Sequence, residues 1–208
     1  TYYVRAYATN EKGTSYGDEK SFTTEEEEEE EEGCEPDGEI NGYGYVDLGL
    51  PSGVKWATCN VGASSPEDYG DYFAWGETNT KAEYTEENSL TEGLTETQLQ
   101  AQGIIDGEGN LTPQHDAATA NWGGSWRMPA KEEMQELVDN CTWEWTQVNG
   151  VNGSKVTGTN GNSIFLPAAG YRNGSSLFNA GENGIYWSSS PYGNYDNLAY
   201  YINFNSDD

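Results

Sequence analysis

Residues 122–143, WGGSWRMPAKEEMQELVDNCTW, contain the one clear amphipathic helix in a chain otherwise patterned as short strands and turns. The apolar side chains of this segment recur at the i, i+3, i+4 and i+7 positions that share one helix face: Met134, Leu137, Val138 and Cys141. Pro129 suits the first turn, because the N–H group that proline lacks would have no helical partner there. The pattern predicts a main helix over residues 130–141, with its apolar face packed against a tryptophan-rich sheet.

A second, shorter helix is predicted over residues 95–102. Thr95 and Gln98 can form a capping box at its start, and Gly103 is typical of a helix end. Most of the remaining chain consists of short apolar or alternating runs bounded by Gly, Asn, Asp and Pro, which is typical of strands and turns. The aromatic run at residues 69–75 is predicted to be a strand or an extended loop. One main helix, one short helix and many short strands predict an α+β fold.

Composition divides the chain into three parts. Residues 1–24 alternate on both sides of the turn NEKG and predict a two-stranded hairpin. Residues 25–42 begin with eight consecutive Glu and continue with Gly and Pro, which predicts a solvated acidic linker because like charges repel one another. Residues 43–208 carry both predicted helices and are long enough to form a domain with its own core.

The net charge of −27 restricts the partners of this chain. The glutamate run supplies eight of those charges, so the rest of the chain still carries −19. Nucleic acids and anionic membrane surfaces are bound through Lys and Arg, of which the chain has nine. We therefore expect neither kind of partner.

The ends of the sequence indicate a fragment. The chain begins without Met, opens and closes on strand patterns, and has neither a signal peptide nor an apolar run long enough to span a membrane. We expect no direct membrane insertion of this segment.

Three cysteines leave the redox state open. Cys59 and Cys141 lie in the same predicted domain, where they form a disulfide or remain as two buried free thiols. Cys34 lies in the polar linker.

No catalytic or metal-ligand set emerges from the residues. His115 precedes Asp116, but nothing marks a nucleophile for such a pair, and Asp116 is better explained as a residue that caps a helix or holds a loop. Asp106, Glu108 and Asn110 alternate as in a calcium loop, but Ala117 stands where that loop needs its last carboxylate, so we expect a turn. A calcium ion elsewhere on so acidic a chain stays possible but has no assigned position.

Several phrases occur in the order known from one family: VDLGLPSGVKWATCNVGASSPEDYGDYFAWGET, NLTPQHDAATANWGGSWRMPAKEEMQELVDNCTW, NGNSIFLPAAGYRNG, YWSSS and AYYINFN. In these phrases residues 43–208 resemble the Fibrobacter succinogenes major paralogous domain family of Bacteroidetes surface proteins. That family is similar to the C-type-lectin-like fold. Residues 1–24 resemble the last two strands of a fibronectin type III-like domain. The resemblance implies a secreted or lipid-anchored protein, extracellular or on the outer-membrane surface.

The chain departs from this family at two places. The helix usually opens with Thr or Ser after the proline, whereas this chain has Ala130, which cannot complete a capping box with Glu133. The family's closing strand, a GFSVRPV-like phrase, is absent, so we expect an exposed strand edge. The formylglycine-generating branch of the fold uses a reactive cysteine pair, but Cys59 and Cys141 have no basic neighbour that would activate a thiol.

The segment NGIYWSSSPYGNYDNLAYYINFN, residues 183–205, is rich in the Tyr, Ser, Asn and Gly that binding surfaces favour. In a lectin-like fold this region would carry the ligand surface. Alternation assigns Leu198, Tyr200, Ile202 and Phe204 to the core. The predicted ligand contacts are therefore Tyr192, Asn194, Tyr195, Asp196, Asn197 and Tyr201, and turn residues between two strands are the alternative explanation.

These observations favour a non-enzymatic binding or adhesion module of a bacterial surface protein, with a glycan or a surface protein as its ligand and no cofactor. A structural stalk or fimbrial subunit is one alternative, because an incomplete sheet edge could accept a donated strand. A receptor domain diversified by a retroelement is another.

Overall fold

The computed structural model describes residues 2–22, 36–193 and 199–207. The chain divides into two compact units, Thr1–Gly33 and Cys34–Asp208. In the first, β1 (Tyr2–Asn10) and β2 (Gly13–Phe22) form the predicted antiparallel hairpin. The side chain of Asn10 accepts a hydrogen bond from the Lys12 amide in the turn, at 2.8 Å. Arg5 pairs with Glu19, which lies directly opposite on β2.

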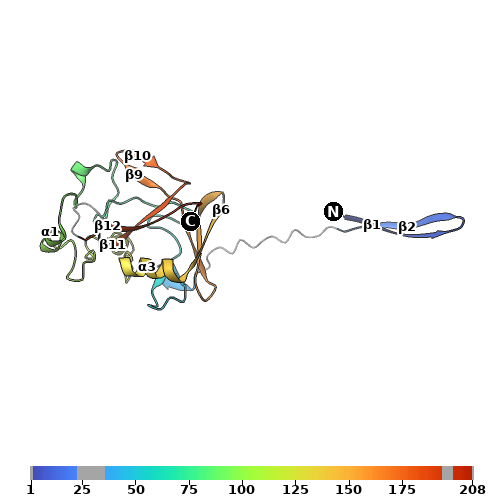
Figure 1. Cartoon of the computed structure of the whole chain (residues 1–208), viewed down its shortest axis with the longest axis horizontal. Helices are drawn as coiled ribbons and strands as arrows, with labels where there is room; N and C mark the ends of the chain where they lie inside the picture. Colours follow the sequence, from blue (N-terminus) through green and yellow to red (C-terminus); the bar gives the residue numbers. More distant parts are fainter. Residues whose placement is uncertain (1, 23–35, 194–198, 208) are drawn as a thin grey trace. The chain divides into compact units, whose positions relative to one another are not determined.

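The second unit is a mixed, mostly β fold with three short helices, as an α+β assignment requires (Figure 1). One antiparallel sheet has the order β3-β4-β5, a second has the order β6-β7-β8, and two further strand pairs are β9-β10 and β11-β12. The strands are β3 (Gly38–Ile40), β4 (Tyr43–Asp47), β5 (Lys55–Ala57), β6 (Thr142–Val148), β7 (Val151–Thr157), β8 (Ser163–Pro167), β9 (Tyr171–Asn173), β10 (Ser176–Phe178), β11 (Gly184–Pro191) and β12 (Ala199–Phe204). The helices are α1 (Glu96–Ala101), α2 (Ala117–Trp122) and α3 (Lys131–Asn140), with a single 3₁₀ turn η1 (Glu86–Asn88).

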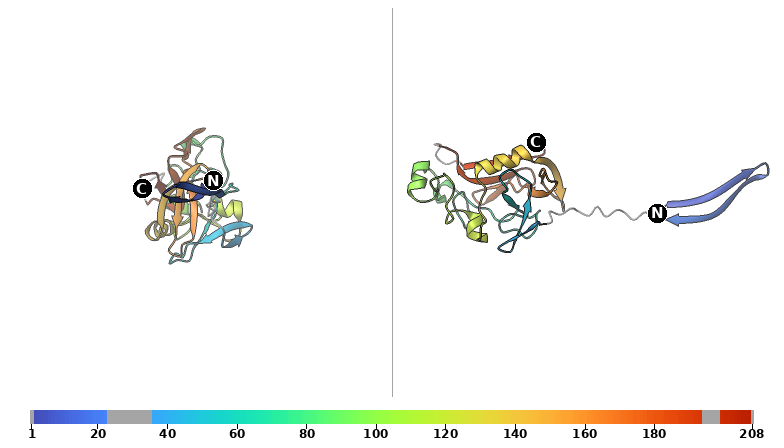
Figure 2. Two further views of the ribbon diagram at one scale, coloured as in Figure 1. Left: turned by 90° about the vertical axis from the view of Figure 1, so that its right-hand side faces the viewer. Right: turned by 90° about the horizontal axis from the view of Figure 1, so that it is seen from below.

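Two hydrophobic clusters hold this unit together. The main core joins the first sheet, the second sheet and α3 through Val46, Leu48, Leu50, Leu137, Val156 and Ile164. A smaller cluster lies beside α1 and contains Leu99, Ile104, Ile105 and Leu111. Helix α3 also packs against β11 and β12 (Figure 2). No helix within the described ranges is both long and apolar enough to cross a membrane.

Both predicted helices are confirmed, within a residue at each end. The capping box of α1 forms as expected, with the Thr95 hydroxyl accepting from the Gln98 amide and the Gln98 side chain accepting from the Thr95 amide. The predicted apolar face of α3 is wrong at Val138, which is 46% exposed, because Met134 and Leu137 alone provide the buried stripe on this helix.

Several elements differ from the sequence prediction, among them β9 and β10, which form within residues 167–181, predicted to be a loop. Residues 38–40, assigned to the linker, form β3 on the edge of β4, so the second unit begins before residue 43. Helix α2 was not predicted, because its six residues are too few to show a helical period. Strand β6 was not predicted either, although two of its residues, Trp143 and Trp145, were expected beside α3. The glutamate run at residues 25–32 lies outside the described residues.

Asp116 caps one helix and holds the start of another, as its sequence position suggested. Its side chain is 2% exposed, its Oδ1 accepts from the Thr119 amide of α2, and its Oδ2 accepts from the Met128 amide, both at 2.8 Å. A buried carboxylate is stable when such donors satisfy it. Asp116 therefore ties α2 to the segment that leads into α3.

We expect Asp116→Ala to lower the free energy of unfolding by about 2–4 kcal/mol, because two buried amides lose their acceptor. Asp116→Asn keeps one acceptor oxygen and should lose less. Urea unfolding of both variants measures the difference. Equal losses would contradict a role for both oxygens.

The N-terminus of α3 should be improved by a hydroxyl. Ala130 has the extended backbone of an N-cap residue, with φ −69° and ψ 161°, and its amide already donates to Glu133 Oε2 at 2.8 Å. Ala130→Ser would add the missing acceptor and raise the free energy of unfolding by about 1 kcal/mol. The matched control is Ala101→Ser at the exposed end of α1, which should give no gain. The same change in urea midpoint for both variants would contradict the capping role.

Candidate functional site

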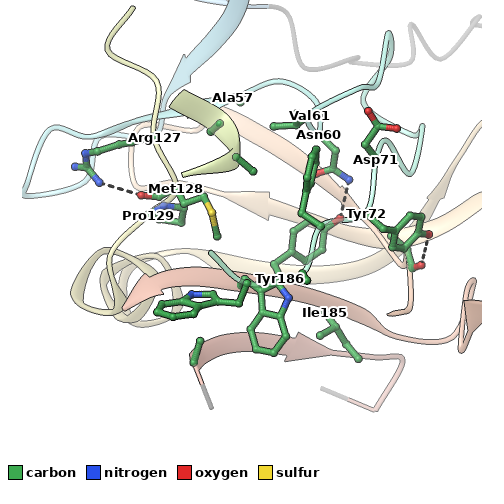
Figure 3. A pocket seen from close by; sticks show the side chains of 18 of the residues that line it. Ala57, Asn60, Val61, Asp71, Tyr72, Arg127, Met128, Pro129, Ile185 and Tyr186 are labelled. Carbon is green, nitrogen blue, oxygen red and sulfur yellow. Dashed lines mark hydrogen bonds between the residues drawn. The ribbon is translucent and has the colours of Figure 1, made fainter. Parts of the chain in front are cut away.

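A cavity of about 660 Å³ opens in the second unit and is walled mainly by aromatic side chains (Figure 3). Its lining comes from the extended segment that follows β5, from residues around the end of α2, and from β9 and β11. The rings of the wall are Trp56, Tyr69, Tyr72, Phe73, Trp75, Tyr84, Trp122, Trp126, Tyr171, Tyr186 and Trp187. Cavities of this size and apolar character are typical of small-molecule sites.

Hydrogen bonds to the backbone fix three of the lining rings. Trp75 Nε1 donates to the Ser188 carbonyl at 2.8 Å, Tyr72 donates its phenolic proton to the Ala169 carbonyl at 2.6 Å, and Tyr186 donates to the Pro167 carbonyl at 2.7 Å. Burial raises the pKa of both phenols, so that they stay protonated donors at neutral pH. These side chains therefore act as rigid rings whose polar atoms already have partners.

One amide side chain joins opposite walls of the cavity. The Asn60 Nδ2 group donates to the Tyr69 carbonyl at 3.0 Å and to the Tyr186 hydroxyl at 3.2 Å. Figure 3 shows the Asn60 amide directed at Tyr186. The extended loop and strand β11 are thus tied together across the cavity.

Two arginines line the cavity, and they have different surroundings. Arg127 donates to both carboxylate oxygens of Glu133, at 2.6 and 2.5 Å, and these hydrogen bonds raise the pKa of Arg127. Burial alone would raise the pKa of Glu133, but hydrogen bonds from Arg127 and from the Ala130 amide outweigh it and lower that pKa. The guanidinium carbon of Arg172 instead lies 5.2 Å from the centre of the Tyr72 ring. Arg127 and Tyr72 are on opposite sides of the cavity in Figure 3.

The two predicted contact residues that the structure describes, Tyr192 and Tyr201, do not line this cavity but neighbour residues that do. Tyr201 is 52% exposed and sits directly across from Trp187 in the β11-β12 pair, with ring centres 5.7 Å apart. Tyr192 is 42% exposed and precedes Gly193, which lines the cavity. The other predicted contacts, Asn194, Tyr195, Asp196 and Asn197, lie outside the described residues.

Sequence reasoning missed most of the cavity wall. The aromatic run at residues 69–75 is an extended loop, one of its two predicted forms, but it was not assigned to a site. Tyr72 bonds to Ala169 and Trp75 to Ser188 of β11, and both partners lie about a hundred residues further along the chain. The density of aromatic residues in that loop was the one available signal.

The remaining polar candidates have structural partners. The Nδ1 atom of His115 lies 3.0 Å from the Gly76 carbonyl. Asp106 Oδ1 accepts from the amides of Glu108 and Asn110, which confirms the predicted turn. Within the described ranges, no three His, Cys, Asp or Glu side chains are grouped as metal ligands would be.

Cys59 and Cys141 are free thiols, so the disulfide alternative is not formed. Cys59 lies 3.7 Å from the Ala63 carbonyl, whereas Cys141 packs against the main core. Burial raises the pKa of both thiols. Cys34 lies outside the described residues.

We expect both thiols to react more slowly than glutathione with a soluble disulfide reagent at about pH 8, because partial burial raises their pKa. The experiment uses a Cys34→Ser variant and compares the rate with that of glutathione and with that of the urea-unfolded chain. Unfolding should accelerate the reaction. A folded chain that reacts as fast as glutathione, or that has an intact mass lower by two hydrogens, would contradict the buried-thiol assignment.

Comparison of the chain with protein families, with curated proteins and with solved structures found no match. What the site can bind therefore follows from its own geometry and chemistry.

Proposed function

We propose that the second unit is a non-enzymatic, extracellular binding module whose ligand is a glycan and whose binding site is the aromatic cavity. The observation that carries the proposal is the set of fixed rings in the cavity wall, with the exposed Tyr201 next to Trp187 at its edge. Aromatic faces offer flat apolar contacts, and a pyranose presents C–H groups that suit them. A calcium ion or another cofactor is not part of the proposal.

The chemistry of the wall supports binding rather than catalysis. Tyr72 and Tyr186 donate their hydroxyl protons to backbone carbonyls, and their raised pKa values place them far from a general base at neutral pH. Arg127 and Glu133 neutralise each other. These groups shape the cavity and leave ring faces for a ligand.

The proposed extracellular location rests on the family resemblance of the sequence. We assign the second unit to a C-type-lectin-like domain of the Fibrobacter succinogenes major paralogous domain family, and the hairpin to the end of a fibronectin type III-like domain. Both assignments imply a bacterial surface protein. The mixed, mostly β architecture of the second unit, with its main helix α3, is compatible with that fold.

The proposal predicts that loss of the rings at the cavity edge weakens glycan binding. An array of oligosaccharides identifies the ligand, and titration calorimetry then measures the dissociation constant with calcium and with chelator. Trp187→Ala and Tyr201→Ala should each weaken binding by about three- to tenfold, the loss expected for one aromatic contact.

The matched control is Tyr7→Ala, which removes an exposed tyrosine from the hairpin unit and should leave affinity unchanged. Thermal unfolding confirms that each variant is folded. Unchanged affinity in both cavity variants would contradict the site, and binding that chelator abolishes would contradict a site built from rings alone.

A further inference from the structure

Arg172 is placed to contact a ligand in the cavity. It lies in the short strand β9, its side chain is exposed, and it belongs to the cavity lining. Its guanidinium lies over the face of the Tyr72 ring. A guanidinium over a ring face can still form hydrogen bonds through its in-plane N–H groups.

The charge of Arg172 is not balanced by a neighbouring carboxylate. Among the described residues it forms no ion pair, whereas Arg127 on the other side of the cavity is held by both oxygens of Glu133. The nearest hydrogen-bond acceptor given for Arg172 is the Ser175 carbonyl, 3.5 Å from Nη1, at the long limit of a hydrogen bond. In a chain with 36 acidic and nine basic residues, an arginine on a cavity wall without a carboxylate partner is unexpected.

We propose that Arg172 selects an acidic sugar, namely an oligosaccharide that carries a uronic acid carboxylate, and that it holds this carboxylate through its in-plane N–H groups. The inference rests on the proposed glycan site. A planar carboxylate matches the fork of a guanidinium, and such charge-assisted pairs are stronger than hydrogen bonds between neutral groups. The sugar ring that bears the carboxylate would then lie against the aromatic wall next to Tyr72.

The negative net charge of the chain favours a ligand with isolated carboxylates over one with closely spaced anionic groups. The net charge of the chain opposes any polyanion, so one local cation is suited to a ligand with one carboxylate at the site. Heavily sulfated saccharides would meet the repulsion of the whole chain. The proposal is therefore specific for uronic acids among the anionic glycans.

The experiment compares an oligosaccharide that carries a single glucuronate with the same oligosaccharide after its carboxyl group has been reduced to an alcohol. Wild-type protein should bind the acid form about tenfold more tightly or better, as expected for a hydrogen-bonded charge pair. Arg172→Gln should abolish this preference, so that the acid form binds no more tightly than the reduced form, which should still bind. Arg172→Lys should keep part of the preference, because lysine retains the charge but not the fork.

The matched control is Lys20→Gln, which removes one positive charge from the hairpin unit and should keep the preference. Rising salt should weaken binding of the acid form more than that of the reduced form. A sulfated oligosaccharide tests the alternative anion, and an Arg172-dependent preference for it would overturn the carboxylate assignment.

The possible failures are distinguishable. Equal affinity for the acid and reduced forms, or an acid preference that survives in Arg172→Gln, would overturn the role of Arg172 and leave the glycan site standing. Absence of binding to every oligosaccharide tested, neutral or acidic, would overturn both proposals.

Discussion

Three buried serines in β11 connect the loop of Trp75, the turn of Asn110 and the approach to α3. Ser188, Ser189 and Ser190 lie where the register of β11 against β12 is interrupted, between Trp187 and Pro191. The backbone groups of these serines that do not pair with β12 form hydrogen bonds with other segments. The Ser188 carbonyl accepts from Trp75, the Ser189 carbonyl accepts from the Leu111 amide, and the Ser189 amide donates to the Pro129 carbonyl. The hydroxyls of Ser189 and Ser190 both donate to Asn110 Oδ1, at 3.1 and 2.8 Å. Since buried polar groups are stable only when paired, this arrangement fixes the loop of Trp75, the turn of Asn110 and the approach to α3 at once.

The hydrogen bonds of this strand also make the candidate site rigid. The ring of Trp75 is held by Ser188, the carbonyl of Pro129 is held by Ser189, and the first amide of α3, at Lys131, donates to the Ser190 hydroxyl at 3.2 Å. Residues on both sides of the cavity are therefore positioned by one short stretch of β11. A preformed wall loses little conformational entropy when a ligand binds, which favours affinity without large contact area.

Local signals in the sequence predicted the local structure. They failed where a residue's conformation depends on a partner far along the chain. The capping box of α1, the turn at Asp106 and the helix α3 all follow from residues a few positions apart. The serine stretch was noted only within the Tyr- and Ser-rich segment 183–205, because nothing nearby in the sequence shows that Asn110, about eighty residues earlier, accepts from it. The short strand β3 has the same explanation, since Gly38 and Glu39 have little strand propensity and are ordered by pairing with β4. Of the candidate site, the sequence predicted none of the lining rings: the predicted contacts Tyr192 and Tyr201 are exposed neighbours of lining residues, and the loop of Tyr72 was not assigned to a site.

The pairing of β11 with β12 decides which side chains of this segment belong to the core and which to the surface. The composition of the segment alone does not show this. Tyr186 and Phe204 stack with ring centres 6.0 Å apart, and Phe204 also meets Trp143 and Trp145 of β6, so this face belongs to the interior. Trp187 and Tyr201 lie on the other face, from which Trp187 lines the cavity, while Tyr186 lines it from the interior face. Gly184 sits opposite Phe204, and a Cβ atom there would come within 2.0 Å of the Phe204 ring, so glycine allows the ring to lie flat against the strand. A shift of one residue would exchange the two faces and turn the binding rings into the core, which makes the register of this strand pair a requirement for the proposed function as much as for the fold.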